Sequence, residues 1–177
     1  MSTSKQIGKP LRKQSGVTLV GMCVALAVMA ILLGTALPAM SGAQQHQQLR
    51  AEAEQLRADI QEVRQLTVMQ GRELRLHVEN ACYIVHDGAS GACHCDAARR
   101  EPVCEGQAQV LKTQWTQASL ASNVKQDLIF KPQYATMASL SLRGRSGEEL
   151  RQIIAITGRV RTCAVGAASS GVTVCEA

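Results

Sequence analysis

Two pairs of arginines near the end of the chain are the residues best suited to bind a ligand by charge. They are Arg143 with Arg145, and Arg159 with Arg161. A planar guanidinium group can donate two parallel hydrogen bonds to a phosphate, so closely spaced arginines are typical of phosphate-binding surfaces. Because alternate side chains of a strand share a face, we expect Arg159 and Arg161 to point the same way, with Val160 inward.

The first pair falls at the end of a predicted strand and in the turn that follows it. We therefore expect all four guanidinium groups, with Lys131 nearby, to form one basic stripe. Four phosphate contacts would give a slope of about −3.6 in a plot of log affinity against log salt concentration. The alternative is a solvated strand face on which some arginines pair with Glu148 or Glu149.

Six cysteines after residue 40 could form disulfides or bind a metal. They are Cys82, Cys93, Cys95, Cys104, Cys163 and Cys175. An even number of cysteines in an exported domain is typical of disulfides, and a Cys163–Cys175 bond would hold the C-terminal tail. Cys93 and Cys95 are too close to bond to each other comfortably. We therefore expect each to reach Cys82 or Cys104, and the sequence leaves that pairing open.

The Cys93-His94-Cys95 segment, with Cys82, His86 and Cys104, also suggests a zinc site. Its C-x-C spacing is tighter than that of common structural zinc sites, and oxidation competes with metal binding outside the cytoplasm. We therefore expect disulfides, with no metal and no cofactor. The histidines accompany no nucleophile elbow, phosphate-binding loop or metalloprotease motif, so we expect no enzymatic activity.

An uncharged apolar segment from Val17 to Met40 precedes these residues and includes the seventh cysteine, Cys23. As a helix rising ~1.5 Å per residue it would extend about 36 Å, enough to cross a ~30 Å hydrocarbon layer. Basic residues alone stand before it, which places the N-terminus in the cytoplasm and the rest of the chain outside. Gly16 comes directly before the segment, so a cut after this small residue would keep the whole apolar helix.

The net charge of +5 is unevenly distributed. Residues 1–16 carry four basic side chains and no acidic ones, and residues 41–130 carry nine basic and eleven acidic ones. Residues 131–177 carry six basic and three acidic side chains. Any basic surface is therefore local and C-terminal rather than a property of the whole protein.

Residues 41–70 are polar, but apolar side chains recur on one face at helical spacing. The stripe consists of Leu49, Ala53, Leu56, Ile60, Val63 and Thr67. The spacing predicts a helix that continues from the apolar segment, packs its stripe on a sheet and ends at Gly71.

The rest of the chain predicts strands, beginning with the alternation of Leu74, Leu76 and Val78 with polar residues. Further strands are expected at 82–85, 110–115, 127–130, 139–143, 150–157 and 160–163. Residues 87–108 are predicted to be a loop and residues 116–126 a connection. The fold class is therefore α+β, with a long N-terminal helix packed on an antiparallel sheet.

The glycine before the apolar helix resembles the class III signal of type IV prepilins and pseudopilins. Thr18-Leu19-Val20 matches the residues that commonly follow the cleavage point, and Pro38 stands where that helix often has a kinking proline. The resemblance implies that a prepilin peptidase cuts between Gly16 and Val17, removing residues 1–16, and methylates Val17. The family normally has glutamate where Gly21 stands. Because some minor pseudopilins without it occupy fibre tips, we expect a tip or initiating role.

Three further segments resemble the GspH/FimT family of minor pseudopilins: Gly71–Val78, Ile129–Pro132 and Thr157–Cys163. The resemblance implies a pilin-like structural subunit of a type II secretion pseudopilus or a type IV pilus. It also implies a bacterial inner-membrane protein with one span at 17–40, a continuing helix at 41–70 and a β-rich periplasmic domain at 71–177. The implied partners are other pilin or pseudopilin subunits, the prepilin peptidase and the inner membrane.

The same family suggests an alternative function in DNA uptake. In FimT-type pilins a Gly-Arg-x-Arg segment is implicated in binding DNA during natural transformation, and Gly158, Arg159 and Arg161 match it. Arg143 and Arg145 join this candidate site by their spacing alone. Aromatic residues are not interleaved with these arginines and no recognition helix is evident, so we expect duplex DNA to be bound without sequence specificity.

Overall fold

The computed structural model describes residues 18–166 and 171–175, without the side chains of residues 32–41. The chain divides into two compact units, residues 1–40 and residues 41–177. Helix α1 (Leu19–Gln70) begins in the first unit and ends in the second. The predicted leader and the predicted processing pair, Gly16 and Val17, lie outside the described residues.

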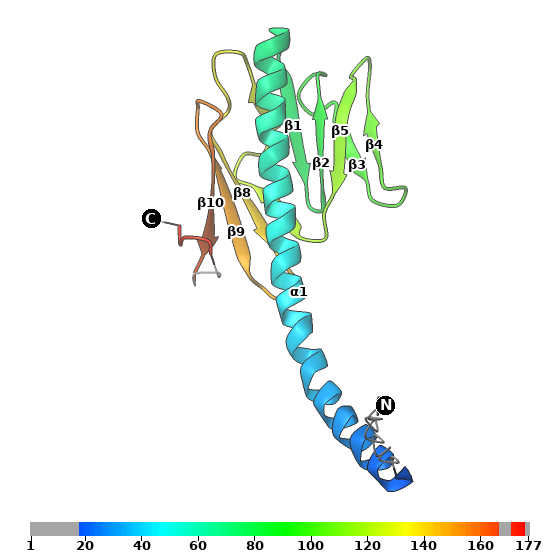
Figure 1. Cartoon of the computed structure of the whole chain (residues 1–177). Helices are drawn as coiled ribbons and strands as arrows, with labels where there is room; N and C mark the ends of the chain where they lie inside the picture. Colours follow the sequence, from blue (N-terminus) through cyan, green and yellow to red (C-terminus); the bar gives the residue numbers. More distant parts are fainter. Residues whose placement is uncertain (1–17, 167–170, 176–177) are drawn as a thin grey trace, which may run out of the picture. The chain divides into compact units, whose positions relative to one another are not determined.

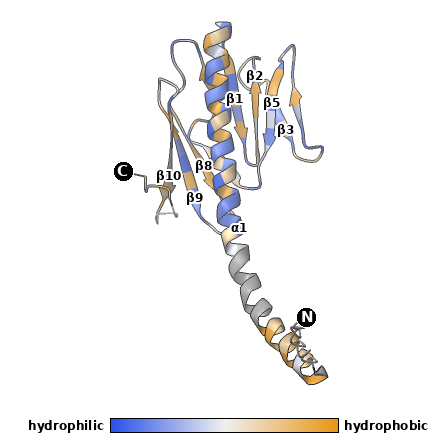
Figure 2. Cartoon of the chain, in the orientation of Figure 1, coloured by the Kyte–Doolittle hydropathy of each residue, from blue (hydrophilic) through white to orange (hydrophobic). Residues whose placement is uncertain are grey.

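The start of α1 is an uncharged and largely hydrophobic stretch of helix (Figure 2). Thr18 precedes it as an N-cap residue, and its Oγ1 accepts a hydrogen bond from the Gly21 N–H at 3.3 Å. Eight large apolar side chains between Leu19 and Ile31 are 51–80% exposed. Across the described residues, no helix has both the length and the apolar character needed to cross a membrane. The predicted span at 17–40 includes residue 17 and the side chains of residues 32–40, which are not among those described.

Residues 41–177 combine the later turns of α1 with three antiparallel sheets (Figure 1). The first sheet has the order β5 (Val110–Trp115), β2 (Cys82–His86), β1 (Leu74–Glu79), β7 (Leu128–Phe130). The second has the order β10 (Val160–Val165), β9 (Glu149–Ile154), β8 (Ala138–Arg143), β6 (Ser119–Ser122). The third is a hairpin of β3 (Cys93–Asp96) and β4 (Glu101–Cys104). The fold is α+β as predicted, with several sheets in place of the one expected.

The later turns of α1 bury one face against both four-stranded sheets. All six residues of the predicted stripe are buried, from Leu49 to Thr67. The five apolar residues of the stripe share one core with Leu74 and Leu76 of β1 and with inward residues of β8 and β9. The helix ends where predicted, at Gly71, whose φ of +65° is the left-handed conformation that favours glycine at a helix C-terminus.

Two predicted connections contain strands, so those two predictions are wrong. Residues 87–108 include the β3–β4 hairpin, and residues 116–126 include β6. The strands of this hairpin are four residues long, and their one large aliphatic side chain, Val103, is exposed, so they lack the apolar face that marks a half-buried strand. In β6 only Leu120 offers a large apolar side chain to the core. The predicted strand 150–157 is also shorter than expected, because β9 ends at Ile154.

Two disulfides build a second, smaller core beneath the β3–β4 hairpin. Cys82 is bonded to Cys95 and Cys93 to Cys104, which decides the pairing that the sequence leaves open. These cysteines pack with Ile84 and Trp115. A third disulfide joins Cys163 to Cys175 and holds the C-terminal segment beside β10.

Candidate functional site

A diagonal row of arginines crosses the outer face of the second sheet, the face turned away from α1. The strand register places Arg161 of β10, Arg151 of β9 and Arg143 of β8 on this face. The residues that precede them in their strands, Val160, Leu150 and Leu142, are buried. Each arginine is one strand across and two residues along from the next. With ordinary strand spacing, successive Cα atoms in the row are about 8 Å apart.

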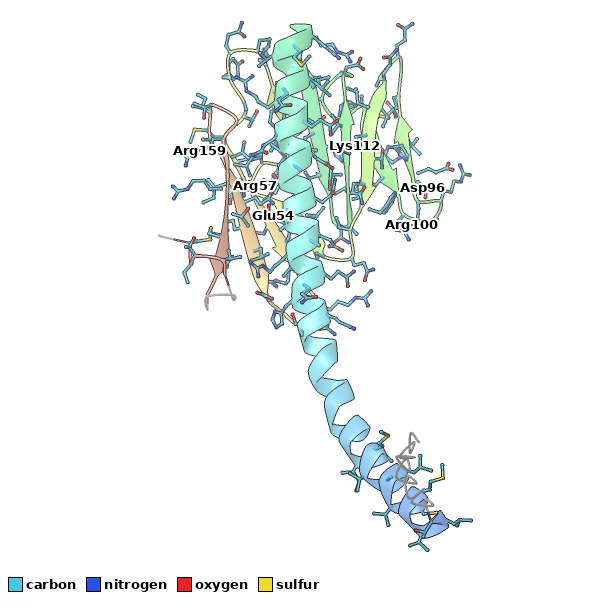
Figure 3. All side chains as sticks on the ribbon, viewed as in Figure 1. Glu54, Arg57, Asp96, Arg100, Lys112 and Arg159 are labelled. Atoms are coloured by element: carbon cyan, nitrogen blue, oxygen red, sulfur yellow. A yellow bond between two sulfur atoms is a disulfide. The ribbon has the colours of Figure 1, made fainter. Side chains whose placement is uncertain are left out.

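This arrangement corrects the predicted stripe of Arg143, Arg145, Arg159 and Arg161 with Lys131. Arg145 lies in the β8–β9 turn, where it lines a small hollow beside α1 instead of the outer face. Lys131 pairs with Glu73 at 3.2 Å and lies over the Tyr134 ring. Arg159 lies in the turn before β10 rather than on the strand (Figure 3), whereas Val160 points inward as expected.

Arg151 is the member of the row that the sequence reading missed. The alternation along β9 is the signal that could have placed Arg151 on the outer face. Leu150 and Gln152 on either side of it are buried, whereas Arg151 is not. The register then places Arg151 between the strands that carry Arg161 and Arg143. Two-residue periodicity can therefore locate an outward arginine once the strand itself is recognised.

The arginines differ in how far their charge is already neutralised. Arg143 Nη2 lies 2.9 Å from Glu149 Oε2, and Arg151 Nη2 lies 3.6 Å from Glu149 Oε1. The hydrogen bond from Arg143 lowers the pKa of Glu149 and keeps its carboxylate charged. Arg159 and Arg161 are exposed, and no carboxylate of the described residues lies within 4 Å of either guanidinium. These two side chains are the more available to an anion.

Gly158 has a packing role that requires no ligand. Arg64 of α1 crosses beneath it and donates from Nη1 to the carbonyls of Lys131 (2.7 Å) and Pro132 (3.0 Å), and from Nε to that of Thr157 (3.3 Å). Gly158 has a φ of +80°, and a Cβ at this position would lie 2.7 Å from Arg64 Cδ. Because Gly158 has no side chain, Arg64 has room to bind the carbonyl groups of two loops at once.

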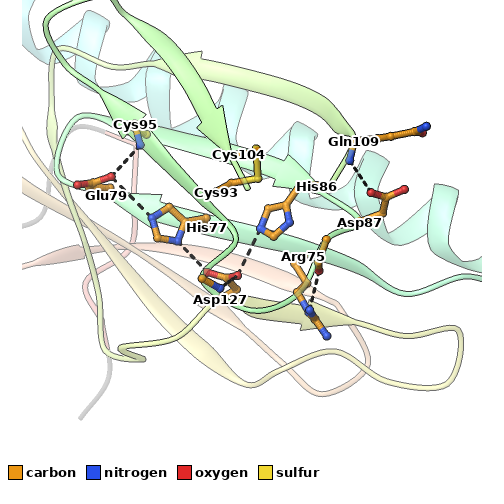
Figure 4. Close-up of a disulfide and its surroundings, with 12 residues drawn as sticks. Arg75, His77, Glu79, His86, Asp87, Cys93, Cys95, Cys104, Gln109 and Asp127 are labelled. Atoms are coloured by element: carbon orange, nitrogen blue, oxygen red, sulfur yellow. Dashed lines mark hydrogen bonds and ion pairs between the residues drawn. A yellow bond between two sulfur atoms is a disulfide. The ribbon is translucent and has the colours of Figure 1, made fainter. Parts of the chain in front are cut away.

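A buried carboxylate lies between two histidines near the disulfide-bonded hairpin (Figure 4). Asp127 Oδ1 is 2.7 Å from His77 Nδ1, and Oδ2 is 3.3 Å from His86 Nε2 and accepts the Gly91 N–H at 2.9 Å. Burial opposes the charged carboxylate, but these contacts outweigh burial and lower the pKa of Asp127. The hydrogen bond to Asp127 raises the pKa of His77. His86 and Asp127 are buried. The cluster of His77, His86 and Asp127 therefore holds β1, β2 and β7 together rather than offering a reactive side chain to solvent.

The cysteine-rich hairpin does not supply the ligands of a zinc site. Thiolates bind zinc, and the structure uses Cys82, Cys93, Cys95 and Cys104 in disulfides. Among the described residues, no group of three or more histidine, cysteine or acidic side chains is arranged to hold a metal ion.

Comparison with known proteins yields one solved structure to report. No family model matches the chain, and no curated protein matches it. The chain is similar to the minor pseudopilin EpsH from the Type 2 Secretion System of Vibrio cholerae, with a TM-score of 0.48 and 11% sequence identity. The similarity covers 68% of this chain and 99% of that one.

Proposed function

We propose that this chain is a pilin-like structural subunit of the minor pseudopilin type. Residues 17–40 would anchor it in the bacterial inner membrane, with residues 41–177 in the periplasm. A prepilin peptidase would remove residues 1–16 and methylate Val17. The subunit would then join a type II secretion pseudopilus or a type IV pilus, in a tip or initiating position.

The observation that carries this proposal is the exposure of apolar side chains at the start of α1. Large side chains from Leu19 to Ile31 are at least half exposed on a helical segment without charge. Exposed apolar surface of this extent is typical of a segment that other proteins or lipid cover. The glycine before it and the domain that packs on the later turns of the helix agree with a pilin-type subunit.

Replacement of Leu26 by lysine tests the proposal. Leu26 is 64% exposed, and a charge within an apolar helical assembly costs about 3 kcal/mol, or more than a hundredfold in a binding constant. We expect Leu26→Lys to abolish co-purification of the chain with the major subunit of its fibre. Met69→Lys is the matched control, since Met69 is 81% exposed on the same helix but in the second unit, and it should leave co-purification unchanged. Normal assembly of the Leu26 variant would overturn the proposal.

Binding of duplex DNA is the second candidate function, and the unpaired state of Arg159 and Arg161 among the described residues favours it. Both are exposed and pair with no carboxylate of the described residues, whereas Arg143 pairs with Glu149 and Arg145 lies in the β8–β9 turn. Two phosphate contacts would give a log–log salt slope of about −1.8 rather than −3.6. Guanidinium groups on an exposed face would contact backbone phosphates and not base edges.

Fluorescence anisotropy of labelled duplex DNA with the full chain in detergent, at two salt concentrations, measures this slope. We expect the Arg159→Ala, Arg161→Ala double variant to lose binding. Arg143→Ala is the matched control, because Arg143 is already paired with Glu149. A slope near −3.6, or equal loss in the Arg143 variant, would mean that the whole arginine face takes part. No binding at low salt would exclude the DNA function.

A further inference from the structure

Strand β10 forms one edge of the second sheet, and only the second half of this edge is paired among the described residues. In the second half, the Ala164 N–H donates to the Thr173 carbonyl and the Ala164 carbonyl accepts from the Cys175 N–H, both at 2.9 Å. Alternate residues of a strand present their backbone groups to the same side, so Val160 and Thr162 direct theirs to this edge as well. Within residues 18–166 and 171–175, no backbone group pairs with Val160 or Thr162 there.

Both edges of the first sheet are covered, in contrast to the first half of the β10 edge. Beside β5 lies the β3–β4 hairpin, with Arg100 over the Trp115 ring at 5.6 Å. Beside β7, the Thr136 N–H donates to the Ile129 carbonyl at 2.8 Å, and Phe130 bridges to Ala135. Uncovered edges attract other strands, and native proteins usually block them.

A hollow of about 410 Å³ opens beside the exposed part of this edge. Its lining includes Ile153, Arg161, Thr162, Thr173 and the Cys163–Cys175 disulfide. The hollow therefore places the Arg161 guanidinium, the Ile153 side chain and the Cys163–Cys175 disulfide next to the backbone groups of Thr162.

We propose that β10 accepts an extended segment of a partner protein as an added strand. Backbone hydrogen bonds to Val160 and Thr162 would align the segment, and a carboxylate side chain would enter the hollow to meet Arg161. Strand addition of this kind takes affinity from the main chain and specificity from pockets that receive alternate side chains. The proposal concerns the second unit alone and does not depend on the assembly role of the first.

The charges around the edge identify the partner as acidic and different from this chain. Pairing of β10 with β10 of a second copy would bring Arg159 and Arg161 against the same arginines, which is unfavourable. The exposed apolar side chains of Ile153 (41%) and Ile156 (56%) favour a protein over the phosphates of a nucleic acid. The occupant is therefore an extended protein segment that carries both acidic and apolar residues.

The first test uses two labelled peptides with the full chain in detergent, one alternating valine and glutamate and the other valine and lysine. We expect the acidic peptide to bind at least about tenfold more tightly. Its binding should slow hydrogen exchange of the Val160 and Thr162 amides, measured by NMR. Failure to bind the acidic peptide, or equal affinity for both peptides, would overturn the proposal.

Two variants separate strand addition from simple charge attraction. Thr162→Pro removes an N–H that points away from β9, so the sheet itself should persist while peptide binding falls at least about tenfold. Arg161→Glu should reverse the peptide preference, and it remains informative if the proline variant does not fold. Arg143→Ala is the control that should bind normally. Unchanged peptide binding by Thr162→Pro, or duplex DNA binding through Arg161 without any peptide binding, would contradict strand addition.

Discussion

Replacing Asp127 by asparagine is expected to lower the free energy of unfolding by about 3–5 kcal/mol, because it removes the charged partner of a buried pair. Asparagine has nearly the same size, but its side chain carries no negative charge to pair with His77 and His86. His86 is fully buried beside it and would be left without a charged partner. Urea unfolding followed by the fluorescence of Trp115, the single tryptophan, measures the loss. Glu54→Gln is the control, since Glu54 pairs with Arg57 at the surface and should change stability by less than about 1 kcal/mol.

The pair of Asp127 and His77 also makes the free energy of unfolding depend on pH. The pKa of Asp127 is lowered in the folded state, so its contribution is present above about pH 4 and is lost as pH falls through the folded-state value. The pKa of His77 is raised, so its contribution is present below about pH 6.5 and is lost as pH rises through the folded-state value. The stability difference between the native chain and Asp127→Asn should therefore be greatest between about pH 4 and pH 6.5. A difference independent of pH would contradict the ion pair.

Replacing Gly158 by alanine is expected to destabilise the chain by about 3 kcal/mol, through two separate costs. A positive φ costs a residue with a side chain about 1–2 kcal/mol. The new Cβ would also displace Arg64, whose charged hydrogen bonds to loop carbonyls contribute about 1.5–3 kcal/mol. Gly147→Ala isolates the first cost, because Gly147 has a φ of +83° with open space around it. Equal losses at the two glycines would rule out the contact with Arg64.

A double-mutant cycle then tests whether Gly158 acts through Arg64. In Arg64→Ala the side chain that a Cβ at position 158 would clash with is absent. Adding Gly158→Ala should then cost only the free energy of placing alanine at a positive φ. The combined loss should therefore fall short of the sum of the single losses by at least about 1 kcal/mol. An additive result would mean that the glycine is required for another reason.

The parts of the fold that could be predicted are those with a strong local period. The helical stripe from Leu49 to Thr67 and the alternation in β1 each identify an element and its buried face. The β3–β4 hairpin could not be found in this way, because its strands are short, have no buried aliphatic side chain and are joined across the register by a disulfide. Hydrophobic period is informative only where a strand has an apolar face.

The parts of the site that could not be predicted depend on contacts between distant residues. Arg64 binds carbonyl groups, which every residue carries, so nothing in the sequence marks Lys131, Pro132 and Thr157 as its acceptors. Asp127 meets His77 across 50 residues through the pairing of β1 with β7. The arginine row likewise depends on the register of three strands, so the sequence alone groups Arg145 with these arginines and leaves Arg151 out.

The intact mass of the chain tests the central proposal, a pilin-type subunit, most directly. The chain would be co-expressed with a prepilin peptidase, extracted from membranes and measured by mass spectrometry. We expect the mass of residues 17–177 with three disulfides and one methyl group on the amine of Val17, and Gly16→Leu should retain residues 1–16. A chain that keeps its leader in the presence of an active peptidase, or that is cut at another position, would contradict it.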